Sequence, residues 1–131
     1  MGEAKGQLVG GNLSVFFSLL GSPSAIETKG KILFLEDLDE YLYHIDRMIQ
    51  NLKRSGLLSE LNGLIIGGMS DMNDNTIPFG KTAEEIIWDT VKEYKYPVCF
   101  NFPAGHIADN RALIIGKETT LKVGEGTVIL G

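Results

Sequence analysis

Three short apolar runs alternate with two stretches of helical periodicity, and this order constrains the fold more than any other feature of the chain. The runs cover residues 31–35, 63–67 and 98–102, and each has the length of a buried strand. Between them, residues 39–55 and 82–94 repeat apolar side chains at helical spacing. Strands that alternate with helices are typical of a parallel sheet. The sequence therefore predicts an α/β fold with a strand–helix alternating parallel core.

The two ends of the chain carry different signals. Residues 1–12 are rich in glycine and are expected to form a linker, with a single domain over residues 13–131. Asn12 is the expected N-cap of a short helix over residues 13–20. After the parallel core, three runs (112–115, 119–123 and 127–130) indicate strands of a C-terminal antiparallel β meander.

Composition excludes several classes of function. The chain has 131 residues, a net charge of −5 and only 12 Lys and Arg. It therefore lacks the excess of basic side chains that is typical of proteins that bind nucleic acid or an anionic membrane. Cys99 is the single cysteine, and His44 and His106 are the only histidines, which leaves no disulfide and no metal cluster. The longest nearly apolar stretch is eight residues, and no secretory signal is visible at the start. A cytoplasmic location without cofactor or metal is expected.

An acid and a histidine each follow a predicted strand. Glu36 comes directly after the run 31–35, and His106 lies just beyond the run 98–102. The carboxyl ends of parallel strands share one edge of a sheet, where sites gather in open α/β folds. A carboxylate bound to Nδ1 of the imidazole would fix its tautomer and leave Nε2 as a base. The alternative is a surface acid and a turn histidine.

Other patterns are weaker. No serine stands in a complete G-x-S-x-G turn, so the chain offers no nucleophile of that type. Asp71, Asn73 and Asn75 have the first spacings of a calcium loop but lack its glycine and its final glutamate, which favours a solvated loop. Gly11 and Asn12, at the start of the helix 13–20, offer N–H groups to an anion, with plain helix capping as the alternative.

Several short motifs occur in a characteristic order. They are Gly10–Leu13 (GGNL), Ile32–Asp37 (ILFLED), Tyr43–Met48 (YHIDRM), Gly67-Gly68 and Pro103–His106 (PAGH). Together they resemble the C-terminal domain of the LD-carboxypeptidases, the serine peptidase family that also includes the microcin immunity proteins. The resemblance covers nearly the whole chain from Gly6, and the tract 39–47 is closer to the carboxypeptidase branch.

The resemblance implies a swivelling β/β/α-like domain and a metal-free Ser–Glu–His triad. Members of the family remove the terminal D-alanine from murein tetrapeptide during cytoplasmic peptidoglycan recycling. By position, Glu36 matches the triad glutamate and His106 matches the triad histidine, while Gly11 and Asn12 are candidate substrate-binding residues. The family's serine lies in an N-terminal domain that this sequence does not contain, so Met1-Gly2 is expected to be an introduced start.

Two hypotheses remain open at this point. In the first, the chain is the catalytic half-domain of a serine LD-carboxypeptidase, inactive without its nucleophile domain. In the second, it is a stand-alone α/β module that binds a ligand or partner and keeps Glu36 and His106 for structure. The first predicts an exposed apolar face for the missing domain, and a homodimer formed through this face or another.

Overall fold

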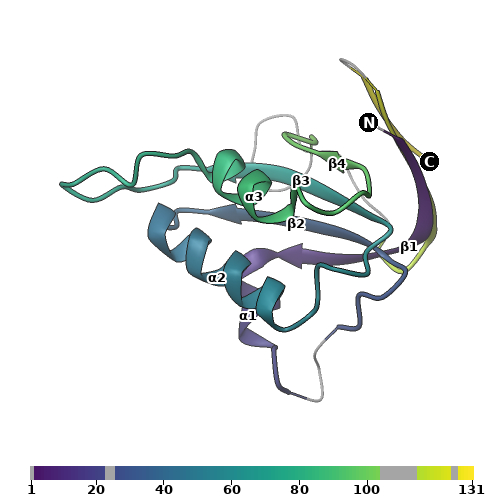
Figure 1. The fold of residues 1–131 in the computed structure, drawn as a ribbon, viewed down its shortest axis with the longest axis horizontal. Coiled ribbons are helices and arrows are strands. Elements are labelled where there is room, and N and C mark those ends of the chain that lie inside the picture. The colour runs from purple at the N-terminus through teal and green to yellow at the C-terminus, as the bar shows by residue number, and fades with distance from the viewer. Residues whose placement is uncertain (1, 23–25, 104–114, 125–126) are drawn as a thin grey trace.

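A computed structural model describes residues 2–22, 26–103, 115–124 and 127–131. The elements follow one another along the chain as β1 (Gly2–Asn12), α1 (Leu13–Ser18), β2 (Ile32–Leu38), α2 (Leu42–Arg54), β3 (Gly63–Ser70), α3 (Ala83–Val91), β4 (Val98–Cys99), β5 (Glu118–Gly124) and β6 (Thr127–Leu130). The strands form one sheet in the order β4-β3-β2-β1-β5-β6 (Figure 1). Strands β1 to β4 are parallel, and β5 and β6 are antiparallel. The predicted α/β class with a parallel core is confirmed.

Strand β1 is the main departure from the sequence-based prediction. Residues 2–12 were expected to form a linker, and that prediction is wrong, because they form the longest strand of the described sheet. The first half of β1 pairs with β5 from Gly2 to Gln7, and the second half pairs with β2 from Leu8 to Asn12. Glycine is disfavoured in strands, so the local sequence did not predict a strand here. The pairing of the two halves of β1 with β5 and β2 supplies order that the isolated segment lacks.

The two faces of the parallel sheet are covered differently. Helices α1, α2 and α3 pack on the face that carries Val9, Leu33 and Leu64, where they form the larger core cluster. The opposite face carries Ile32 and Ile65, and it packs against Leu121 of β5. The sheet curls to allow this contact, which gives a nearly closed barrel; Figure 1 shows the β5–β6 hairpin at the opposite end of the molecule from the β3–α3 loop.

Local signals for the helices are confirmed with small changes in their bounds. Asn12 caps α1, because its side chain accepts a hydrogen bond from the Val15 backbone N–H. Thr82 and Glu85 form the expected capping box at the start of α3. The helix expected over 39–55 is α2, which begins three residues later, at Leu42. No helix of the described residues has the length and apolar character needed to span a bilayer.

The C-terminal strands confirm the predicted antiparallel arrangement over the described residues. Strand β5 pairs with both β1 and β6, and the pair Gly124 and Thr127 closes its ladder with β6. The predicted strand at 112–115 lies mostly outside the described residues, as do two residues of the predicted turn, 125 and 126.

Candidate active site at the carboxyl edge

Glu36 lies near the end of β2, at the carboxyl edge of the parallel strands. Its backbone is in register with Asn12, the last residue of β1. Glu36 is only 6% exposed, and its Oε1 accepts a hydrogen bond from the Asn12 amide at 3.4 Å. The structure therefore brings together two of the residues that the sequence singled out. A buried carboxylate at this edge is placed where α/β folds build their sites.

Two consecutive glycines precede Asn12, and their surroundings differ. Gly10 has a φ of +117°, and a Cβ built on it would lie 2.0 Å from the Phe34 carbonyl oxygen. Only glycine fits there, because β1 and β2 approach closely. Gly11 has a φ of +146°, and a Cβ there would meet no atom within 4 Å. The space beside Gly11 is open, next to Asn12 and Glu36.

Asp37 and Ser14 also belong to this site, although no sequence pattern predicted a role for either of them. Asp37 is 3% exposed, and its Oδ2 accepts hydrogen bonds from the Ser14 backbone N–H at 3.0 Å and from Ser14 Oγ at 2.5 Å. Its Oδ1 accepts from the Asn12 amide at 3.2 Å and from the Leu38 N–H at 2.8 Å. A second acid directly after Glu36 was visible in the sequence. The contact between Asp37 and Ser14 joins residues that are 23 positions apart, so no local sequence pattern predicts it.

The ladder between β2 and β3 is irregular beside these two carboxylates. In a regular strand, neighbouring side chains point to opposite faces of the sheet. Here the register between β2 and β3 shifts between Leu35 and Asp37, so that Gly67 and Gly68 together face the single residue Glu36. The extra residue lies in β3, and bulges are common beside active sites.

A serine, a glutamate and a histidine meet beside this network without forming a catalytic triad. Ser14 Oγ lies 3.4 Å from Glu40 Oε1, and Glu40 Oε2 lies 2.5 Å from His44 Nδ1. In a triad the imidazole lies between the hydroxyl and the carboxylate, whereas here the carboxylate lies between the other two. The Ser14 proton is directed at Asp37, the nearer of its two acceptors. This arrangement does not activate Ser14 as a nucleophile.

His106 lies outside the described residues, so its distance from Glu36 stays a prediction. The chain leading toward it is described as far as Pro103. Strand β4 ends at Cys99, and the Phe102 N–H donates to the Ile66 carbonyl of β3 at 3.0 Å. The segment that contains His106 therefore follows a strand whose carboxyl end lies on the same edge of the sheet as Glu36.

The other sequence candidates are explained by local structure. In the β3–α3 loop, Asp74 Oδ1 accepts from the backbone N–H groups of Asn75 and Phe79, as expected of a solvated loop with Asx turns. Asn73 donates to Asp39 at 2.6 Å. Cys99 is buried in β4, and burial raises the pKa of its thiol to about 11, which makes it a poor nucleophile at neutral pH.

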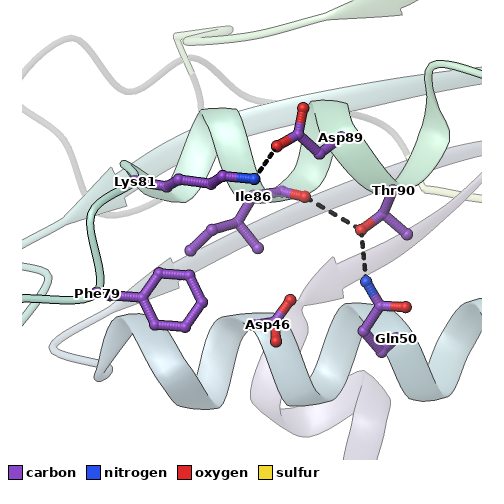
Figure 2. Close-up of a pocket in the computed structure, with 7 residues that line it drawn as sticks. All are labelled: Asp46, Gln50, Phe79, Lys81, Ile86, Asp89 and Thr90. Carbon is purple, nitrogen blue, oxygen red and sulfur yellow. Dashed lines mark hydrogen bonds and ion pairs between the residues drawn. The ribbon is translucent and has the colours of Figure 1, made fainter.

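A groove of about 330 Å³ lies away from these residues, between α2 and α3 (Figure 2). Its walls come from α2, α3 and the end of the β3–α3 loop: Asp46, Gln50, Phe79, Lys81, Ile86, Asp89 and Thr90. Lys81 is paired with Asp89, and Gln50 donates to Thr90 Oγ1 at 3.0 Å. The polar groups that line the groove largely satisfy one another, and neither Asn12 nor Glu36 belongs to its lining.

Comparison with known proteins gives a consistent result. The family model described as the LD-carboxypeptidase C-terminal domain matches residues 5–121. A probable murein peptide carboxypeptidase of Bacillus subtilis is 36% identical over 98% of this chain and 40% of its own length. The chain thus spans about two fifths of this relative.

Solved structures show the same likeness in three dimensions. The muramoyltetrapeptide carboxypeptidase of Oxalobacter formigenes matches with a TM-score of 0.87 and 29% identity, over 98% of this chain and 45% of that protein. An MccF-like protein of Bacillus anthracis matches with a TM-score of 0.77 and 26% identity, over 98% of this chain and 40% of that protein. Both matches extend across the sheet and the helices described above.

Proposed function

The chain belongs to the LD-carboxypeptidase C-terminal domain family, and we propose that Glu36 and His106 are the glutamate and histidine of its Ser–Glu–His triad. The proposed reaction is hydrolytic removal of the terminal D-alanine from murein tetrapeptide, in cytoplasmic peptidoglycan recycling. The observation that carries the proposal is the buried Glu36 carboxylate at the carboxyl edge. The segment that contains His106 follows β4 at that edge, which supports the pairing.

The chemistry assigns each group one role. Glu36 accepts a hydrogen bond from Nδ1–H of His106, which holds the imidazole in one tautomer and stabilises its protonated form. Nε2 takes the proton of the serine hydroxyl as its oxygen attacks the carbonyl of the L,D-peptide bond, and then gives it to the departing D-alanine amine. Water repeats the cycle on the acyl-enzyme. Burial of Glu36 strengthens its interaction with a charged imidazole.

Gly11 and Asn12 are the proposed substrate-binding residues. The absence of atoms around the Cβ position of Gly11 lets a peptide approach the backbone of β1. Asn12 lies beside it, and its amide is already fixed by hydrogen bonds to Glu36 and Asp37. A peptide bound along this end of β1 would lie next to the triad carboxylate.

The nucleophile is proposed to come from an N-terminal domain outside this chain. Large apolar side chains are exposed on the elements that meet at the carboxyl edge, among them Val15, Leu38 and Tyr41, with Ile77 of the β3–α3 loop 85% exposed. An interdomain contact of roughly 600–1,500 Å² would cover such a surface. In its absence, the isolated chain is expected to self-associate, and the longer protein is proposed to be a homodimer.

D-alanine release from murein tetrapeptide tests this function in the longer protein that contains the chain. Glu36→Gln is expected to lower kcat by about 10⁴-fold, the loss found when a triad carboxylate is replaced elsewhere. His106→Ala is expected to remove activity almost entirely. The isolated 131-residue chain should release no D-alanine above its own His106→Ala variant.

Two matched controls use the same residue types. Glu60 is an exposed glutamate on the loop before β3, and His44 is the other histidine of the chain. Glu60→Gln and His44→Ala should leave kcat within about two-fold of wild type. Unchanged kcat in Glu36→Gln would contradict the triad role of Glu36, and D-alanine release by the isolated chain would contradict a nucleophile from another domain. A longer protein that releases no D-alanine would favour a non-enzymatic binding module.

A further inference from the structure

Asp37 is a buried carboxylate that the proposed triad does not use. It receives four hydrogen bonds, all from neutral donors: two backbone N–H groups, the Ser14 hydroxyl and the Asn12 amide. We propose that Asp37 is a positioning residue for catalysis, because it holds Asn12 and the start of α1 against Glu36. This inference rests on the proposed function, since it concerns the orientation of the triad carboxylate.

Asn12 is the link between Asp37 and Glu36. Its Oδ1 accepts from the Val15 N–H at 3.0 Å, which fixes which end of the amide faces α1. Its Nδ2 is therefore turned toward the two carboxylates, at 3.2 Å from Asp37 Oδ1 and 3.4 Å from Glu36 Oε1. An amide held at both ends presents its N–H groups to Glu36 in one orientation.

Asp37 also fixes the element on which this arrangement is built. Both hydrogen bonds from Ser14 reach the same oxygen, Oδ2, and tie the first turn of α1 to the end of β2. Helix α1 has only six residues, so its own hydrogen bonds define its direction poorly. Asp37 is the residue next to Glu36 in β2, where the ladder with β3 is irregular. Misplacement of a catalytic group by about 1 Å can cost 10²-fold in rate.

The test measures D-alanine release by the longer protein with Asp37→Asn. The substitution replaces one oxygen of the carboxylate with an NH₂ group, which donates and cannot accept a hydrogen bond. The hydrogen bond from the Asn12 amide is therefore lost, while the size of the side chain is kept. The expected result is a fall in kcat of about 10–100-fold with KM within about three-fold, because ground-state binding is largely kept. Asp74→Asn is the matched control: Asp74 also accepts two backbone N–H groups but lies in the β3–α3 loop, and kcat should not change.

A double-mutant cycle separates positioning from a purely structural role. Asn12→Ser keeps an N-cap for α1 but removes the amide that reaches Glu36 and Asp37. If Asp37 acts through Asn12, then Asp37→Asn should cause little further loss of kcat in the Asn12→Ser background. If the two substitutions act independently, their fold losses in kcat will multiply in the double variant, and that result overturns the inference.

The outcomes also distinguish this inference from the proposed function. A wild-type protein that releases no D-alanine, or an active Glu36→Gln, rejects the proposed function itself. Loss of activity in Glu36→Gln together with normal kcat in folded Asp37→Asn rejects only the positioning role. If Asp37→Asn does not fold, Asn12→Ser decides alone: unchanged kcat in that variant overturns the inference.

Discussion

The carboxyl edge and the groove between α2 and α3 both contain acidic side chains, but the two regions satisfy them by different means. At the edge, Asp37 is 3% exposed and is held by backbone, hydroxyl and amide donors. In the groove, Asp89 lies at the surface and pairs with Lys81 (Figure 2). It also pairs with Lys92. The first arrangement joins segments distant in sequence, whereas the second lies within one helix and the turn before it.

The difference shows which charges determine geometry. A buried carboxylate without hydrogen bonds would be costly, so its partners must keep fixed positions. An exposed ion pair is solvated whether or not it forms, and long lysine side chains lose entropy when they are held. The edge is thus expected to be rigid and sensitive to substitution, and the groove to be tolerant.

The largest effect is expected from Gly10→Ala at the edge. The added Cβ would overlap the Phe34 carbonyl oxygen in the ladder between β1 and β2, and neither backbone can move alone. The free energy of unfolding should fall by about 4 kcal/mol or more, or the domain should fail to fold. Urea denaturation followed by circular dichroism measures this change.

Gly11→Ala is the control for that experiment. It imposes a similar backbone penalty, since φ is also positive, but its Cβ points into open space. The expected loss is about 1–3 kcal/mol, the cost of the unfavourable φ alone. Equal losses in the two variants would show that the close approach of β1 to β2 is not what requires Gly10.

An intermediate effect is expected from Ser14→Ala. The substitution removes the hydroxyl donor at 2.5 Å from Asp37 but keeps the backbone donor of the same residue. The free energy of unfolding should fall by about 1.5–3 kcal/mol, as for one hydrogen bond to a charged group. Ser18→Ala in the same helix should change little, because its hydroxyl is exposed and bonds only the Val15 carbonyl among the described residues. Equal effects of the two variants would remove the contrast between the edge and an ordinary exposed helix position.

The smallest effect is expected from Lys81→Met in the groove. The ion pair lowers the pKa of Asp89 and raises the pKa of Lys81. Its contribution is therefore present between the ordinary values of 3.8 and 10.5, and it disappears as the pH falls through the lowered Asp89 pKa or rises through the raised Lys81 pKa. Because both groups are exposed, thermal denaturation at pH 7 should show no resolvable change in Tm. A clear loss of stability at pH 7 that shrinks as the pH falls below 3.8 would contradict the contrast between the two regions.

Local sequence patterns predicted most of the framework. The apolar runs of β2 and β3, the capping box at Thr82 and the N-cap at Asn12 each depend on side chains within a few residues of one another. Strand β1 was missed because its glycines disfavour a strand when considered alone. It forms because β2 and β5 supply backbone partners along its two halves.

The candidate site was predictable in part. Glu36 was identified because it follows a buried apolar run, and that position alone places it at the carboxyl edge. No local pattern predicted the role of Asp37, because its contacts with Asn12 and Ser14 join residues more than 20 positions apart. The irregular pairing of Glu36 with Gly67 and Gly68 likewise joins strands that are distant in sequence.

By itself, the sequence determined the class of the fold, the starts of α1 and α3 and the position of Glu36 near the end of a strand, because short-range periodicity and capping control these features. Only the tertiary structure decided that residues 2–12 form a strand in the interior of the sheet, and that Asn12, Ser14 and Asp37 form one network around the candidate site. The physical reason is that a buried polar group must find its partners wherever the packed chain supplies them, and here they lie more than 20 residues away.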